Sequence, residues 1–325
     1  MTSHEPHHHL PLTARSHTAL RRLELRVVRR LDGLLHGEHL GLRLGPGSEP
    51  AEARPYQPGE DDVRRMDWSV TARTTHPHVR DLVADRELES WTLLDLSASM
   101  DFGTATSEKR DVAIGALAAV TVLTQHVGDR FGAHLLHHGH IRRWPAHSGK
   151  NALYTLLSAI TATPRSAPHH GATLTDALDD LARTRPRRGL RVIISDFLTP
   201  TTATPADTGH PWEHPLRHLA TRHQTLAIEI VDPRELDLPP IGLTTMTDPE
   251  TGHTREVHLS ASLRRRYAHA ARAQRDSVRA ALRRSGVPHL LLRTDRDWIV
   301  DIARFVIEQR RTAHRLARHT PASPR

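Results

Sequence analysis

The chain has 325 residues, of which 37% are hydrophobic and 25% charged, a balance that is typical of globular proteins and excludes a fully disordered chain. Lys and Arg together number 45 against 37 Asp and Glu, which gives a formal net charge of +8. The sequence contains no cysteine, which excludes disulfides, thiolate zinc sites, iron–sulfur clusters and a cysteine nucleophile.

Both ends of the chain have the composition of loose segments. Residues 1–17 are rich in His and Pro and lack the apolar core of a signal peptide, so we expect a disordered terminus there and a disordered tail over 313–325. The longest strongly apolar stretch, Val112 to Leu123, is shorter than the roughly 20 residues that cross a bilayer. These features predict a cytoplasmic protein with no membrane partner.

Residues 18–88 form the first ordered region that we expect. Leu20 to Leu35 repeats Leu and Val at three- and four-residue spacings, which predicts an amphipathic helix. A segment rich in Gly and Pro follows, Gly37 to Gly59, and indicates short extended pieces joined by turns. The region therefore reads as an N-terminal helix followed by a small annex of loops and strands.

Residues 89–312 alternate between strand and helix patterns and form the second region. Alternation of this kind predicts an α/β fold with a mostly parallel sheet flanked by helices. The expected strands are Trp91–Ser97, Phe131–Leu136, Ile141–Trp144, Arg191–Phe197, Thr225–Val231 and His289–Leu292. The expected helices are Lys109–His126, Asn151–Ile160, Thr175–Arg183, Leu216–His223, Leu263–Arg284 and Asp297–Gln309.

Polar side chains follow two of the expected strands. Asp95, Ser97 and Ser99 form the pattern D-x-S-x-S after the first strand, and Asp196 ends the apolar run RVIISD. In open α/β sheets, sites form outside the carboxyl ends of the strands. Carboxylate and hydroxyl oxygens are the hard ligands that Mg²⁺ or Mn²⁺ prefers, so the pattern is compatible with a metal loop.

The Gly-led loop GATLTD offers a further hydroxyl, from Thr173 or Thr175. Two carboxylates, two serines and a threonine would leave one coordination position open. Taken alone, however, D-x-S-x-S is also ordinary turn and N-cap material, and the short pattern does not separate the two interpretations.

The other conspicuous residues favour simpler interpretations. Among the 27 histidines, His134, His137, His138 and His140 lie on an expected strand and turn without helical metal spacing, so a dedicated zinc site is not expected. The densest basic segment, Leu263 to Arg284, has apolar positions on one helical face, and we interpret its arginines as a solvated face of a packed helix. Nucleic acid is therefore not the expected partner.

Three motifs in order, DLSASM, GATLT and IISDF, resemble the metal-ion-dependent adhesion site of the von Willebrand factor type A domain. The preceding segment RPYQPGEDDVRRMDWSVTARTTHPHVRD, Arg54 to Asp81, resembles the signature of the bacterial domain-of-unknown-function family number fifty-eight. Members of that family join such a segment to a type A domain. Further similarity lies in HGEHLGLRLGPGSE, EKRDVAIGALAA and DPETGHTREVHL, so the resemblance covers about residues 20 to 310.

This resemblance implies the ligand set and the function. It assigns Asp95, Ser97 and Ser99 to the first metal loop, Thr173 to the second and Asp196 to the third, with Thr175 as the alternative threonine. Proteins of this kind are typically encoded beside MoxR-type AAA+ ATPases and are thought to act as adaptors in chaperone-like assembly or metal insertion. The resemblance thus implies a non-enzymatic adaptor with weakly bound Mg²⁺ or Mn²⁺ and an open position for a partner carboxylate.

Two other functions stay open at this point. A metal-assisted phosphohydrolase could use Asp95 as nucleophile or ligand, although Ser97 stands where a second aspartate would serve as acid or base. A basic nucleic-acid-binding protein is the less favoured alternative.

The signature segment also carries Trp68 among mixed charges. The simplest interpretation is that Trp68 locks the annex to the type A sheet, and the alternative is a surface for a partner.

Overall fold

A computed structural model describes residue 31 and residues 53–57, 66, 68–74, 76–80, 89–105, 107–124, 129–166, 171–184, 189–198 and 209–319. The expectations for residues 1–17 and for most of the helix Leu20–Leu35 lie outside this part of the chain. Leu31 is helical and only 1% exposed, and it belongs to the main hydrophobic core.

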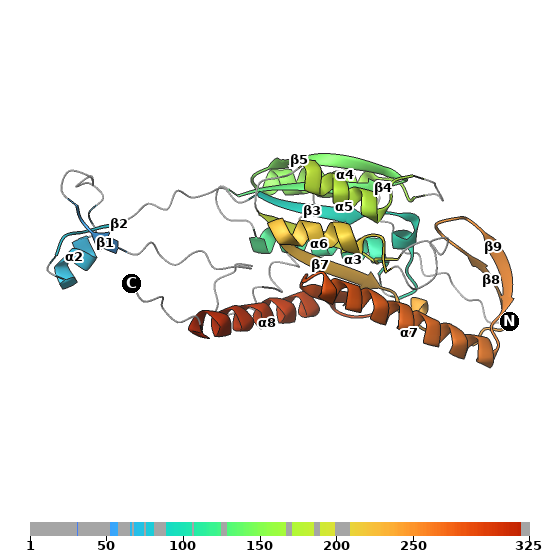
Figure 1. Ribbon diagram of the computed structural model, residues 1–325. Helices are drawn as coiled ribbons and strands as arrows, with labels where there is room; N and C mark the ends of the chain where they lie inside the picture. The colour runs from blue at the N-terminus through green and yellow to red at the C-terminus, as the bar shows by residue number, and fades with distance from the viewer. Residues whose placement is uncertain are drawn as a thin grey trace.

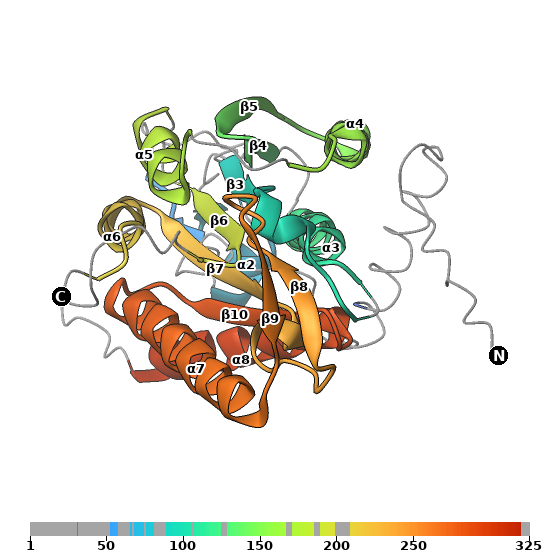
Figure 2. The same cartoon turned by 90° about the vertical axis from the view of Figure 1, so that its right-hand side faces the viewer.

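A six-stranded sheet forms the centre of the molecule, with the strand order β10-β7-β6-β3-β4-β5 (Figures 1 and 2). All neighbouring pairs are parallel except β4 and β5, which form an antiparallel hairpin at one edge. The strands are β3 Glu89–Asp95, β4 Arg130–His137, β5 His140–His147, β6 Leu190–Ser195, β7 Gln224–Val231 and β10 His289–Arg293.

Helices cover both faces of this sheet, as Figure 2 shows. One core packs α3, α4 and α8 against one face, and the other packs α5, α6 and α7 against the opposite face. The helices are α3 Lys109–Thr124, α4 Lys150–Ala162, α5 Leu174–Thr184, α6 Glu213–Arg222, α7 Ala261–Arg284 and α8 Trp298–His319, and two short 3₁₀ helices are η2 Ala98–Asp101 and η3 Pro233–Glu235.

The central strands are apolar on both sides because both faces are covered. Leu94 and Ile194 point into the core with α3, whereas Leu93 and Ile193 point into the core with α5 and α6. A strand buried on both faces reads as a continuous apolar run, which is why these segments lack the alternation of a half-exposed strand. The predicted α/β class, with a mostly parallel sheet flanked by helices, is confirmed.

Each expected strand and helix of residues 89–312 is present, with ends that differ by a few residues. The largest difference is in α8, which continues to His319, so the boundary expected at residue 312 falls inside this helix. The sequence analysis also did not anticipate a two-stranded antiparallel ribbon between β7 and α7, formed by β8 Leu243–Thr247 and β9 Thr254–His258.

The annex contributes a small separate unit, with β1 Ala53–Pro55, α2 Trp68–Thr74 and β2 His78–Arg80. Figure 1 shows these elements apart from the six-stranded sheet. Trp68 is 68% exposed, so the expectation that it locks the annex to the sheet is wrong. Its indole covers no core, and its large apolar face is available at the surface.

Among the described helices, none combines the length and the apolar character that crossing a membrane requires.

Candidate functional site

The strand order places a topological switch point at the carboxyl ends of β3 and β6. The chain leaves β3 toward β4 on one side, and later leaves β6 toward β7 on the other side. Connections that diverge in this way open a crevice at the switch point of a doubly wound sheet, where ligands commonly bind. Asp95 ends β3 and Asp196 follows β6, so both lie at this point.

The carboxylate of Asp95 is buried, with 4% of the residue exposed. Its Oδ1 accepts a hydrogen bond from the backbone N–H of Ser97 at 2.9 Å, and its Oδ2 accepts one from the hydroxyl of Ser195 at 2.7 Å. The first contact closes a turn directly after β3, and the second ties this turn to β6. The loop is therefore held against the neighbouring strand by the carboxylate itself.

The turn brings two hydroxyls together beside Asp95. Ser97 and Ser99 have their Oγ atoms 3.2 Å apart, and Ser99 is buried at the start of η2. The backbone N–H of Ser99 donates to Oε1 of Glu250, a residue 151 positions later in the chain, at 2.9 Å. Asp95, Ser97 and Ser99 thus converge, as expected from their spacing.

Asp196 belongs to a buried cluster of charges. Its Oδ2 accepts a hydrogen bond from Nζ of Lys109 at 2.7 Å, and the same ammonium also contacts Oε1 of Glu235. Arg275 completes the cluster, because its Nη1 donates to the backbone oxygen of Asp196 and to Glu229, and its Nη2 donates to Glu235. Lys109 is fully buried, and these carboxylates compensate the positive charge of its ammonium group.

The loop after Asp196 is held in an unusual conformation. Phe197 has a φ of +54°, in the left-handed region that a bulky residue seldom adopts. Its buried ring packs edge-on against Trp212, with 5.2 Å between the ring centroids. The N–H of Phe197 donates to Ser195 Oγ, so this turn also supports the hydroxyl that binds Asp95.

The two aspartates have opposite electrostatic environments. Burial and the nearby charge of Asp196 raise the pKa of Asp95 from 3.8 to about 6. Burial also opposes ionisation of Asp196, but Lys109, Arg275 and the Leu198 N–H together hold the pKa of Asp196 below its ordinary value. Of these two aspartates, Asp196 is paired with a buried cation, whereas Asp95 has no ion pair with a cation among the described residues.

Thr173 is at the same edge of the sheet but has a different partner. The N–H of Ala172 donates to Gly139 in the β4–β5 turn, which holds the loop in place. The exposed Thr173 hydroxyl accepts from the backbone N–H of Asp176 at 3.4 Å, as an N-cap of α5, and donates to the Asp176 carboxylate at 2.7 Å. Among the described contacts none joins Thr173 to Asp95 or the serines, and Thr175 lies within the first turn of α5.

The donor set at Asp95 fits a divalent cation. One carboxylate without a cationic partner and two adjacent hydroxyls supply hard oxygen atoms, which are the ligands that Mg²⁺ takes. Within the part of the chain that the structure describes, no three His, Asp or Glu side chains form a metal-binding group. A cation here would therefore depend on Asp95, Ser97 and Ser99, with Asp196 close enough to add charge.

Sequence reasoning missed four residues of this region, namely Lys109, Ser195, Glu235 and Glu250. Lys109 is one of only two lysines in the chain, and Ser195 directly precedes Asp196. Glu250 lies in the segment DPETGHTREVHL that shares the family resemblance, but neither it nor Glu235 could be assigned to the site, because their contacts with Ser99 and Lys109 span more than 120 residues.

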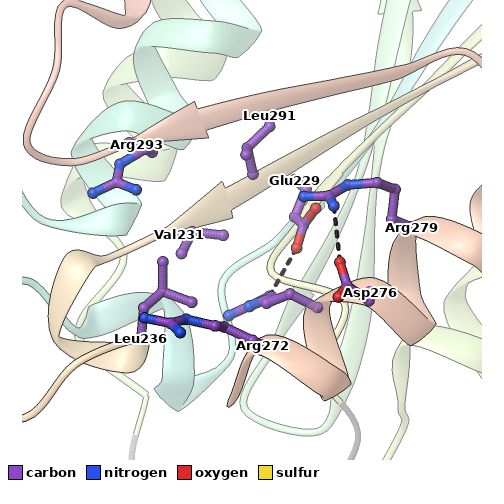
Figure 3. Close-up of a pocket in the computed structure, with 9 residues that line it drawn as sticks. Glu229, Val231, Leu236, Arg272, Asp276, Arg279, Leu291 and Arg293 are labelled. Atoms are coloured by element: carbon purple, nitrogen blue, oxygen red, sulfur yellow. Dashed lines mark hydrogen bonds and ion pairs between the residues drawn. The ribbon is translucent and has the colours of Figure 1, made fainter. Parts of the chain in front are cut away.

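A cavity of about 250 Å³ has Arg275 in its wall. Figure 3 shows it between α7 and the strands β7 and β10, with Val231, Leu236 and Leu291 beside several arginines. Arg279 pairs with Asp276 within α7, and Arg275 pairs with Glu229. The cavity wall is thus largely charge-compensated, and it shares Arg275 with the buried cluster around Asp196.

A model of the family described as "Protein of unknown function DUF58" matches residues 52–277. The chain belongs to the DUF58 family. The "Uncharacterized protein Rv1480" of Mycobacterium tuberculosis is 51% identical to this DUF58 chain over 295 residues, which is 91% of the chain and 90% of the relative. The "Uncharacterized protein Mb1516" of Mycobacterium bovis matches with the same identity and coverage.

Solved structures similar to this DUF58 protein include the conserved hypothetical protein BatB from Bacteroides thetaiotaomicron. It has 13% identity and a TM-score of 0.39, and the match covers 69% of this chain and 99% of BatB. A von Willebrand factor type A protein from Catenulispora acidiphila has 15% identity and a TM-score of 0.38, with 69% of this chain and 42% of that one covered. The family resemblance found in the sequence is confirmed by the family model.

Proposed function

We propose that this protein is a non-enzymatic adaptor that binds a partner protein through a divalent cation, Mg²⁺ or Mn²⁺. The cation would be held by Asp95, Ser97 and Ser99, near Asp196, and would supply a positive centre that attracts a carboxylate of the partner. The family and its α/β fold support a role in protein interaction. The metal and the identity of the partner are the parts that we propose in addition.

The observation that carries the proposal is the geometry of the loop after β3. Asp95, Ser97 and Ser99 converge at the switch point of the sheet, and Asp95 is the carboxylate without a cationic partner there. A purely structural turn would not need a buried carboxylate beside a second one, because that arrangement costs free energy unless a proton or a cation compensates it.

The proposed partner is a MoxR-type AAA+ ATPase, and the proposed context is chaperone-like assembly or metal insertion. This part rests on the family resemblance of the signature segment and the type A motifs. The net charge of +8 would attract an acidic partner over a distance. Because such an ATPase draws on ATP, the proposal places the encounter in the cytoplasm.

The proposal assigns no catalytic turnover to the site. A phosphohydrolase of the type considered would need a second acid or base two residues after Asp95, where Ser97 stands, and the nearby Asp196 is already paired with Lys109. Hydrolysis of a generic phosphate ester that is lost in Asp95→Asn would contradict this assignment.

The test is a calorimetric titration of the protein with a purified MoxR-type AAA+ ATPase, in Mg²⁺ and in chelator. We expect binding in Mg²⁺, none in chelator, and none for the double variant Asp95→Ala with Ser97→Ala. The matched control is Asp237→Asn, because Asp237 is an exposed aspartate two residues after η3 and its replacement should leave binding unchanged. Equal binding with and without chelator would contradict the metal-dependent contact and would favour the annex around Trp68.

A further inference from the structure

The ribbon formed by β8 and β9 ends at the metal loop. Figure 2 shows the tip of this ribbon in front of the segment that follows β3. The contact is the hydrogen bond from the N–H of Ser99 to Oε1 of Glu250, at 2.9 Å. A carboxylate from a distant part of the chain therefore lies beside the two serine hydroxyls.

The turn at the tip is built to present Glu250. Asp248 accepts hydrogen bonds from the N–H of Glu250 at 3.0 Å and from the hydroxyl of Thr251 at 2.7 Å. Gly252 has a φ of +71°, which a residue with a side chain adopts only with strain, and its N–H donates to the backbone oxygen of Asp248. These contacts close the turn and leave the Glu250 side chain directed toward Ser99.

Few other contacts among the described residues fix the rest of the ribbon in place. It pairs only with itself in a two-stranded sheet, and Leu243 on β8 is 66% exposed. Its base is joined by the hydrogen bond from Leu259 N–H to the backbone oxygen of Gly242. An isolated two-stranded hairpin is only marginally stable, so the contact at the tip can open at small cost.

We propose that Glu250 is an internal carboxylate ligand of the site formed by Asp95, Ser97 and Ser99, which a partner carboxylate must displace. One oxygen of Glu250 binds the Ser99 N–H, and its second oxygen, Oε2, has no hydrogen-bond partner among the described residues. This free oxygen is the one that would face the cation. The inference rests on the proposed function and names how the same site is regulated.

Tethering makes this internal ligand a strong competitor. A group linked to its site by a short segment acts at an effective concentration in about the millimolar range. A partner carboxylate would therefore bind only when the rest of its interface outweighs this competition. As a consequence, free carboxylates and small acidic metabolites would not displace Glu250 from the site.

The experiment measures Mn²⁺ affinity of the full chain by electron paramagnetic resonance of the free ion. We expect Glu250→Gln to weaken Mn²⁺ binding about tenfold, because one charged ligand is lost. The matched control is Glu256→Gln, since Glu256 is an exposed glutamate on β9 of the same ribbon and its replacement should change the affinity less than about twofold. Hydrogen exchange gives a second readout: Mn²⁺ should slow exchange of the Thr251 and Gly252 amides in the parent chain and not in Glu250→Gln.

The outcomes separate this inference from the proposed function. If Glu250→Gln binds Mn²⁺ as tightly as the parent while Asp95→Asn does not bind it, the internal ligand is refuted and the metal site stands. If the parent chain binds no Mn²⁺, both are refuted.

Discussion

The buried ammonium of Lys109 offers the sharpest test of how the site is held together. In Lys109→Met, the side chain keeps a similar length and apolar stem but loses its charge. The Nζ atom contacts Asp196 at 2.7 Å and also contacts Glu235, and the side chains of all three residues are at most 14% exposed. The substitution would leave two buried carboxylates without this cation, next to a third at Asp95.

The expected cost is large. Removing one partner of a buried ion pair typically costs about 3–5 kcal/mol, because the remaining charge is uncompensated. Burial alone would lower the pKa of Lys109, yet Asp196 and Glu235 raise it above its ordinary value, so the ammonium is charged in the folded state. We therefore expect Lys109→Met to lower the free energy of unfolding by about 3–5 kcal/mol near neutral pH.

The assay is equilibrium unfolding in urea, followed by far-ultraviolet circular dichroism. Lys150→Met is the matched control, because Lys150 is the other lysine of the chain and is exposed, and it should change stability by less than about 0.5 kcal/mol. Adding Glu235→Gln to Lys109→Met should restore part of the loss, by a coupling of about 0.5–3 kcal/mol. A loss below about 1 kcal/mol for Lys109→Met would refute the reasoning.

Three further predictions concern single residues. Because Asp95 has a pKa of about 6 and binds a cation only when ionised, Mg²⁺ affinity measured by calorimetry should fall about tenfold between about pH 7.5 and pH 5, and a constant affinity would argue against Asp95 as ligand. In Gly132→Ala, the new Cβ would overlap the ring of Trp91, so we expect a loss of about 1–3 kcal/mol in urea unfolding, and a neutral result would contradict this close packing. Thr173→Ala removes the hydroxyl that binds Asp176 at the start of α5, and thermal unfolding should show a loss of about 1 kcal/mol; unchanged stability would mean that this cap contributes nothing.

The annex shows where inference from residue types failed. Trp68 is large and apolar, and such residues usually cover a core, which favoured a role in locking the annex to the sheet. It is instead 68% exposed on a short helix of its own unit. Residue type gives the preference for burial, but only the path of the chain decides whether a core is within reach.

The β8–β9 ribbon was missed for a related reason. Its strands are mostly exposed, so they carry Thr, Arg and Glu in place of the apolar residues that identify a buried strand. The pairing of the two strands and the turn at Asp248 depend on specific contacts between residues. The spacing of apolar residues in the sequence does not reveal such contacts.

The sequence by itself determined the α/β class, the chain order of the strands and helices that build the six-stranded sheet and its two covering layers, and the convergence of Asp95, Ser97 and Ser99. Buried strands must be apolar and helices must repeat their apolar positions, so both leave a local pattern, and Asp95, Ser97 and Ser99 are neighbours in the chain. The tertiary structure alone decided that Asp196 pairs with Lys109 and that Glu250 reaches Ser99. These contacts join residues 87 and 151 positions apart, and the physical reason is that charge compensation depends on distance in space, which a linear sequence does not contain.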